Sequence, residues 1–131
     1  MSYCLDTSTY SFFRRGHPEL VALMQTAPQL AISAIVVGEL LAGFKHGSGT
    51  RQNELKLDEF LASKRVRLLP VDATTAGRFA DISTYLRRHG TPLPSNDVWI
   101  AAHAMQHGLR VVTLDKHFGL MPQVSTLLIG S

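Results

Sequence analysis

The sequence is poor in cysteine and in long apolar runs, and each shortage excludes a class of protein. A single cysteine, Cys4, rules out an internal disulfide and suits a reducing compartment, and its apolar neighbours predict that it is buried. No stretch is long and apolar enough to span a bilayer. The N-terminal segment is interrupted by Asp6 and carries its basic residues after its apolar ones, unlike a signal peptide. We therefore expect a soluble, cytoplasmic protein without a membrane partner.

The sequence also lacks internal repeats, low-complexity tracts and linkers. Its 131 residues are 45% hydrophobic, which is enough for one hydrophobic core, so we expect residues 1–131 to form a single domain. The formal net charge is +3, from 13 basic and 10 acidic residues. If four acids share one pocket, the rest of the chain has 13 basic against 6 acidic residues, or +7. A basic rim around a concentrated acidic site suits a polyanion held near cations.

Short apolar segments alternate with helical patterns along the chain. This alternation predicts an α/β fold in three layers, a mostly parallel sheet with helices on both faces. In such sheets ligands bind beyond the carboxyl ends of the strands. Predicted helix caps are Thr7 or Ser8, Ser33 and Ser95. We expect strands at 2–5, 30–32, 66–71, 110–114 and 124–129, and helices at 7–15, from Pro18 onward, 34–45, 48–62, 74–89 and 96–107.

Two acids directly follow predicted strands, and two lie in predicted helices. Asp6 follows the first strand and Asp115 follows the strand at 110–114, so both belong at the carboxyl edge of the sheet. Glu39 lies about two turns into its helix, and Asp97 lies in the first turn of the helix at 96–107. If these helices leave the same edge, all four acids approach one point.

Glu39 is the most informative of these acids. It is the only charged residue between positions 34 and 44, in a helix that is apolar on nearly every side and is therefore expected to be buried. A buried carboxylate needs a metal ion or a hydrogen-bond donor as its partner. Asp97 also needs a partner, but less strongly than Glu39. It lies near a helix N-terminus, which favours a carboxylate by about 0.3–1 kcal/mol.

Each acid also has an ordinary structural interpretation. Asp6 can cap the helix that follows it, Asp97 can interact with its helix dipole, Asp115 can initiate a turn, and Glu39 can pair with a distant arginine. Taken together, however, four acids in this placement favour a shared site, because clustered carboxylates repel one another unless cations are bound. Ligands that are all carboxylates select Mg²⁺ or Mn²⁺, and phosphodiester hydrolysis is the chemistry suited to that site.

Four segments together resemble the PIN-domain nucleases, and in particular the VapC-type toxins of bacterial toxin–antitoxin pairs. The resemblance covers the whole chain, and the order and spacing of the segments carry it. The segments are Leu5-Asp6-Thr7-Ser8, Ser33-Ala34-Ile35-Val36-Val37-Gly38-Glu39-Leu40, Asn96-Asp97-Val98-Trp99-Ile100-Ala101-Ala102 and Val112-Thr113-Leu114-Asp115-Lys116-His117-Phe118.

The resemblance implies a PIN-like fold and cleavage of RNA, tRNA or another structured RNA, by a Mg²⁺- or Mn²⁺-dependent endoribonuclease. It assigns metal binding to Asp6 and Asp97 most firmly, with Glu39 and Asp115 completing the catalytic cluster as ligands or through water. Ser8 and Thr113 match positions that support the site by hydrogen bonding; the family pattern often has Asn at the position of Ser8. A homodimer and a cognate antitoxin are the implied partners. A non-catalytic RNA-binding domain and a DNA-directed nuclease remain alternatives.

Other chemistry-bearing residues receive plainer interpretations. His103 and His107 have a spacing compatible with zinc but lack a third ligand, so a packing or surface role is favoured. Trp99 can stack on a base, although its apolar neighbours favour packing. Lys116 and His117 are interpreted as ordinary loop residues. Candidate phosphate contacts are Arg14, Arg15, Arg87 and Arg88.

Overall fold

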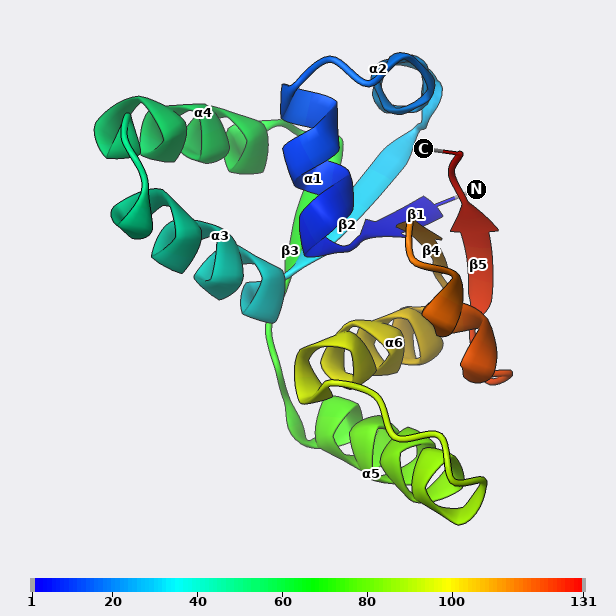
Figure 1. Cartoon of the computed structure of the whole chain (residues 1–131). Helices are drawn as coiled ribbons and strands as arrows, with labels where there is room; N and C mark the ends of the chain where they lie inside the picture. The colour runs from blue at the N-terminus through cyan, green and yellow to red at the C-terminus, as the bar shows by residue number, and fades with distance from the viewer. Residues whose placement is uncertain (1, 131) are drawn as a thin grey trace.

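A five-stranded, wholly parallel sheet forms the centre of the computed structural model, which describes residues 2–130 (Figure 1). The order of the strands across the sheet is β3-β2-β1-β4-β5. The α/β class predicted from the alternation of strands and helices is therefore confirmed. The strands are β1 (Ser2–Leu5), β2 (Gln29–Ser33), β3 (Val66–Leu69), β4 (Arg110–Thr113) and β5 (Ser125–Leu128).

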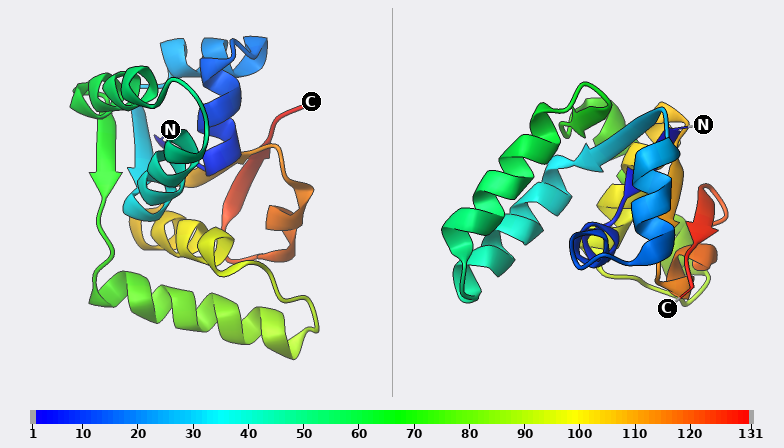
Figure 2. Two further views of the ribbon diagram at one scale, coloured as in Figure 1. Left: turned by 60° about the vertical axis from the view of Figure 1, so that its left-hand side comes forward. Right: turned by 90° about the horizontal axis from the view of Figure 1, so that it is seen from above.

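Helices cover both faces of this sheet, as the views of Figure 2 show. Helices α1 and α2 pack on one face, while α6 covers the other and separates the sheet from α5. Helix α3 leaves the end of β2 and contacts both α1 and α6, so it joins the two helical layers at the carboxyl edge of the sheet. The helices are α1 (Thr7–Arg14), α2 (Pro18–Thr26), α3 (Ala34–His46), α4 (Thr50–Ala62), α5 (Ala73–Arg88), α6 (Ser95–His107) and the short 3₁₀ helix η1 (Lys116–Leu120).

Successive residues of the central strands are buried on opposite faces of the sheet. Leu5 and Val112 pack against α2, whereas Cys4 and Val111 belong to the cluster that includes the buried residues of α6. Because both faces are covered, these strands are continuous apolar runs rather than alternating ones. Cys4 is fully buried, as predicted, and burial raises the pKa of its thiol to about 12.

The direction in which the chain adds strands reverses at β1. Strand β2 lies on one side of β1 and β4 on the other, and a crevice at such a switch point is the usual ligand site of open α/β sheets. Leu5 is paired with Val112 across β1 and β4. The residues that follow these two strands therefore emerge side by side at the carboxyl edge.

Two of the predicted helix caps are wrong. The side chain of Asp6, rather than that of Thr7 or Ser8, caps α1. Ser95 is the first residue of α6, and the cap position is held by Pro94, which provides no side-chain bond. The fixed backbone of proline replaces a hydrogen-bonding cap there. Ser33 does cap α3, and its Oγ accepts from the backbone of Ile35 at 3.0 Å.

Helix α3 is less buried than its apolar sequence predicted. Only Val36 and Leu40 are buried, because the outer side of the helix carries the small residues Ala34, Gly38 and Ala42. Within residues 2–130 no helix is both long and apolar enough to cross a membrane.

Candidate active site

Asp6 and Thr113 form the buried floor of the acidic site. Asp6 is 5% exposed and accepts two hydrogen bonds, from the backbone of Thr9 to Oδ1 at 2.8 Å and from Thr113 Oγ1 to Oδ2 at 2.6 Å. The hydroxyl of Thr9 donates to the carbonyl of Val112 at 2.8 Å, which ties the start of α1 to β4. Asp6 therefore has an ordinary capping role in addition to its place in the cluster.

Asp115 is connected to Asp6 through a single hydroxyl group. Its backbone N–H donates to Thr113 Oγ1 at 2.9 Å, and the same hydroxyl donates to Asp6. The carboxylate of Asp115 caps η1 by accepting from the backbone of His117 at 2.9 Å, and its Oδ1 lies 2.8 Å from His117 Nδ1. Asp115 is thus held by its own turn and stays partly exposed.

Glu39 is held by polar groups from two other helices. Its Oε1 accepts from Thr7 Oγ1 at 2.6 Å, and its Oε2 accepts from Asn96 Nδ2 at 3.0 Å. One carboxylate therefore joins α1, α3 and α6 at the carboxyl edge of the sheet. The predicted need for a partner is met in this structure by hydrogen-bond donors.

Asp97 is the acid whose charge is least compensated. Its pKa is raised to about 6, first because the side chain is partly buried and then because the charges of Asp115, Asp6 and Glu39 lie near it. In residues 2–130 no hydrogen bond to its carboxylate is found. A nearby cation would favour the ionised form of this carboxylate and lower its pKa.

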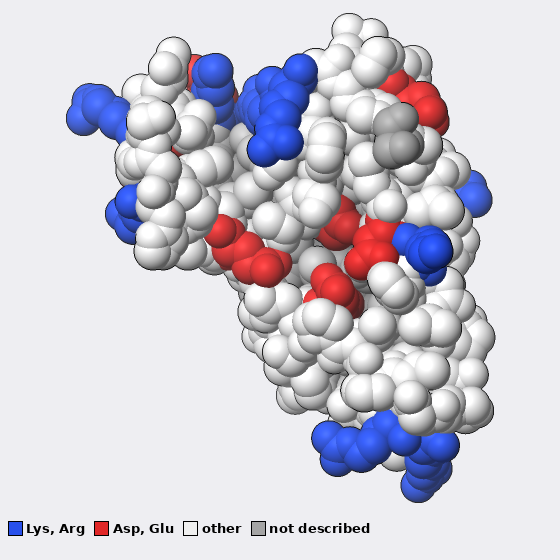
Figure 3. Space-filling view, in the orientation of Figure 1, with Lys and Arg blue, Asp and Glu red and all other residues white. Residues whose placement is uncertain are grey.

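The four acids gather in a hollow on one face of the molecule. Figure 3 shows acidic atoms around the centre of this face, with lysine and arginine at its margins. Within the described part of the chain, the one ion pair made by a lysine or arginine joins Arg78 to Asp81. No lysine or arginine of residues 2–130 therefore neutralises the cluster directly.

The donor set is compatible with a hard divalent cation, although the side chains do not yet form a cage. All four groups are carboxylates, the ligands that Mg²⁺ and Mn²⁺ prefer. Across residues 2–130, no three acidic, histidine or cysteine side chains are arranged to hold a metal ion as they stand. The neighbouring negative charges that help to raise the pKa of Asp97 are the kind of field that a bound cation would offset.

Of the two residues expected to support the site by hydrogen bonding, Thr113 bonds to Asp6 as predicted and Ser8 does not bond to the acids. Ser8 is exposed, and in the described chain no hydrogen bond joins its side chain to the acids. The hydroxyl of Thr7 donates to Glu39 instead, and the backbone N–H of Thr9 donates to Asp6. Asn96 was not singled out as a site residue, although it lies beside Asp97 in the first turn of α6. Its polar side chain at the edge of the sheet was the available signal.

The histidines and the tryptophan of α6 lie in the packing of helices rather than in the site. His103 is fully buried, and burial together with the nearby His107 lowers its pKa to about 4, so it is neutral at pH 7. Trp99 stacks on Phe79 of α5 with ring centroids 4.0 Å apart. The packing interpretations of His103 and Trp99 are confirmed.

Comparison with known proteins identifies the family. A family model described as "PIN domain" matches residues 3–123. The chain belongs to this family. Within it, the chain is 30% identical to "Ribonuclease VapC2" of Rickettsia felis over 129 residues, which are 95% of each sequence. The resemblance inferred from the four sequence segments is thereby confirmed.

Solved structures of PIN-family proteins share this fold over nearly the whole chain. The structure of VapBC2 from Rickettsia felis, bound to a DNA fragment from its promoter, aligns with a TM-score of 0.89 and 28% identity over 98% of this chain and 99% of that one. VapBC-5 from Mycobacterium tuberculosis, a member of the VapBC family of toxin–antitoxin systems, aligns with a TM-score of 0.76 and 28% identity, covering 98% of both chains.

Proposed function

We propose that this PIN-domain chain is a metal-dependent endoribonuclease that acts as the toxin of a toxin–antitoxin pair. The observation that carries the proposal is the environment of Asp97, a carboxylate whose pKa is raised first by partial burial and then by three neighbouring acids at the carboxyl edge of the sheet. Buried repulsion of this kind is typical of a functional site. The ribonuclease name of the Rickettsia relative supports RNA as the substrate. Structured RNA, including tRNA, is the class that we expect.

The proposed metal ligands are the carboxylates of Asp6 and Asp97, with Glu39 and Asp115 completing the site directly or through water. The ion that fits these oxygens is Mg²⁺ or Mn²⁺. Its chemistry there is the activation of a water molecule and the stabilisation of negative charge on the phosphate.

The remaining residues of the site position these carboxylates. Thr113 holds Asp6 and the backbone of Asp115, so the two strand ends keep a fixed relation to each other. Thr7 and Asn96 occupy both oxygens of Glu39 and fix its orientation. Groups held in this way lose little freedom when substrate binds, which is how a preorganised site lowers an activation barrier.

A cognate antitoxin and a second copy of this chain are the proposed protein partners. The antitoxin is supported by the likeness to VapBC-5, a member of a toxin–antitoxin family, with a TM-score of 0.76. The homodimer is supported only by the family. With RNA as substrate, the proposed place of action is the cytoplasm.

The decisive experiment is cleavage of RNA by purified protein that is free of antitoxin. Labelled tRNA and single-stranded RNA should be cut in Mg²⁺ or Mn²⁺ and left intact in EDTA. Asp6→Asn and Asp97→Asn should each remove cleavage while circular dichroism and thermal unfolding show a folded protein. Asp81→Asn is the matched control, because Asp81 is an exposed acid paired with Arg78.

Three results would contradict the proposal. Cleavage that persists in EDTA excludes metal dependence, and undiminished cleavage by either site variant excludes that residue. RNA binding without cleavage in Mn²⁺ supports a non-catalytic RNA-binding domain. Faster cleavage of a DNA strand of the same sequence supports a DNA-directed nuclease.

A further inference from the structure

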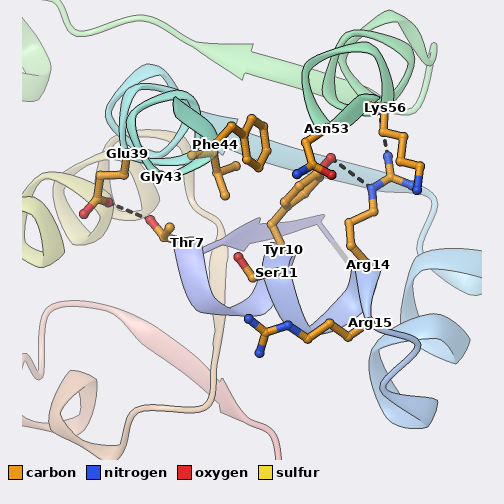
Figure 4. A pocket seen from close by; sticks show the side chains of 11 residues that line it. Thr7, Tyr10, Ser11, Arg14, Arg15, Glu39, Gly43, Phe44, Asn53 and Lys56 are labelled. Atoms are coloured by element: carbon orange, nitrogen blue, oxygen red, sulfur yellow. Dashed lines mark hydrogen bonds between the residues drawn. The ribbon is translucent and has the colours of Figure 1, made fainter. Parts of the chain in front are cut away.

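A groove of about 480 Å³ runs between α1, α3 and α4, next to the acidic cluster (Figure 4). Its walls carry both polar and apolar side chains. Glu39 and its partner Thr7 lie at one end, so the groove opens directly onto the proposed site. The lining residues are Thr7, Tyr10, Ser11, Arg14, Arg15, Glu39, Leu40, Gly43, Phe44, Asn53 and Lys56.

The charge of this groove changes along its length. Glu39 is its only acid, whereas Arg14, Arg15 and Lys56 line the part away from the cluster. A second groove of about 480 Å³, which contains Asp97 and Asp115, lies beside the same cluster and has no lysine or arginine in its lining. Of these two grooves, only the one between α1, α3 and α4 therefore offers lysine and arginine side chains that can hold a polyanion which also reaches the acidic cluster.

The two arginines of this groove have different environments. Arg14 is fixed, since it donates to Tyr10 Oη and to the carbonyl of Lys56, both at 2.9 Å, and lies over the Tyr10 ring. The Cζ atom of Arg15 lies 5.2 Å from the centroid of the Phe12 ring. Its side chain extends back along α1 toward Ser11 (Figure 4). Within residues 2–130, no hydrogen bond or ion pair engages its guanidinium, so its donors are free for a ligand.

We propose that the groove between α1, α3 and α4 binds a single-stranded segment of the RNA beside the scissile bond, and that Arg15 contacts a backbone phosphate there. The inference rests on the proposed function and names the path of its substrate. Free cations along a groove that tracks the backbone are how proteins hold single strands. The continuity with Glu39 places this segment next to the proposed catalytic groups. Arg15 is a binding residue and takes no part in the chemical step.

The test measures RNA binding separately from cleavage. All variants are made in an Asp97→Asn background and assayed in EDTA by fluorescence anisotropy with a short fluorescein-labelled single-stranded RNA. Arg15→Gln should weaken binding about tenfold and lower the slope of log affinity against log salt by about 0.7, the value for one lost phosphate contact with a single strand. Arg15→Lys, which keeps the charge, should restore most of that slope.

Arg78→Gln is the matched control. It removes the same charge from the exposed side of α5, and Arg78 lines neither groove. It should weaken binding by less than about twofold, because only the general field of the protein changes. Thermal unfolding of each variant checks that the fold is unchanged. In the active protein, Arg15→Gln should raise KM while kcat stays within about twofold.

Equal effects of Arg15→Gln and Arg78→Gln would overturn the inference, because net charge alone would then explain binding. An Arg15→Gln variant that binds RNA normally but loses affinity for an antitoxin would also overturn it and would make the groove a protein-docking surface. A different result would contradict the proposed function alone. If the protein binds RNA through Arg15 but cuts no RNA, the proposed function fails and the inference about the groove holds. If the protein cuts RNA and Arg15→Gln does not weaken RNA binding, the inference fails and the proposed function holds.

Discussion

The two halves of the acidic site are built on different principles. At the strand ends, Asp6 and the backbone of Asp115 share the hydroxyl of Thr113, and each carboxylate oxygen of Asp6 accepts one hydrogen bond. On the helices, Glu39 is held by two side chains, and Asp97 carries a raised pKa without any donor found in residues 2–130. The comparison indicates that the sheet fixes the positions of Asp6 and Asp115 before any ligand binds. The state of Asp97, in contrast, depends on whether a cation binds beside it.

The largest expected effect is the loss of cleavage in Asp97→Asn and Asp6→Asn, and the two changes should differ in stability. Several kcal/mol of lost charge stabilisation correspond to about a thousandfold slower cleavage. Without metal, Asp97→Asn should raise stability by relieving repulsion, whereas Asp6→Asn should lower it by about 1 kcal/mol through its mismatched bond with Thr113. Urea unfolding in EDTA measures the free energy of unfolding of both variants. If the two substitutions changed it in the same direction, the distinction between the strand-end acids and the helical acids would be lost.

Thr113→Val should have the next largest effect. The substitution keeps the shape of the side chain but leaves Asp6 Oδ2 and the backbone N–H of Asp115 without their partner, which costs about 1–3 kcal/mol. Loss of a group that orients metal ligands typically lowers activity about 10–100-fold. Thr126→Val in β5 is the control, and an equal loss of cleavage in that variant would show a general effect of the substitution.

Thr7→Val should be milder than Thr113→Val. It removes one of the two hydrogen bonds of Glu39, at a partly buried position where Asn96 still holds the other oxygen. We expect a loss of about 0.5–1.5 kcal/mol in unfolding free energy and a smaller fall in cleavage rate. If Thr7→Val proved as damaging as Thr113→Val, the helical half would be as strictly positioned as the strand ends.

The raised pKa of Asp97 predicts how stability depends on pH in the metal-free protein. The folded state holds this proton up to about pH 6, whereas an unperturbed aspartate releases it near pH 3.8. The contribution of Asp97 to stability is therefore present at low pH and declines as the pH rises from about 4 to 6. The difference between wild type and Asp97→Asn in urea unfolding across this window should show the decline, and saturating Mg²⁺ should cancel it. If the difference in unfolding free energy between wild type and Asp97→Asn did not change with pH, Asp97 would not have a raised pKa in the folded protein.

Ser8→Ala should have the smallest effect. Ser8 is exposed, so the change should alter stability by less than about 0.5 kcal/mol. Cleavage should stay close to the wild-type rate, which steady-state kinetics can check beside Thr7→Val. A strong loss would restore the supporting role that the family resemblance assigned to this residue.

The sequence predicted most reliably what local pattern determines. Asp6 and Asp115 were placed correctly at the sheet edge because each follows a short apolar strand, and a parallel sheet aligns such ends. The partners of Glu39 were beyond that reasoning. Asn96 lies 57 positions away, and its contact depends on how α3 and α6 are oriented, which no local pattern encodes.

The outer side of α3 shows a second limit of sequence reasoning. Its apolar composition predicted burial all round, but small residues such as Gly38 and Ala42 contribute little apolar surface and are left exposed at low cost. The short helix η1 was also missed, because five residues starting after Asp115 show no helical period. Capping of α1 by Asp6 was considered only as an alternative to metal binding. One carboxylate can both cap a helix and bind a metal ion.

The bond between Thr113 and Asp6 joins residues 107 positions apart, and this separation has a consequence for the timing of synthesis. A growing chain that has emerged from the ribosome only as far as α6 contains Asp6, Glu39 and Asp97 but has neither β4 nor Asp115. Its first strand still lacks a neighbour on one side. The proposed cutting site can therefore assemble only after β4 and Asp115 have left the ribosome, so a nascent chain that ends at α6 lacks part of the site.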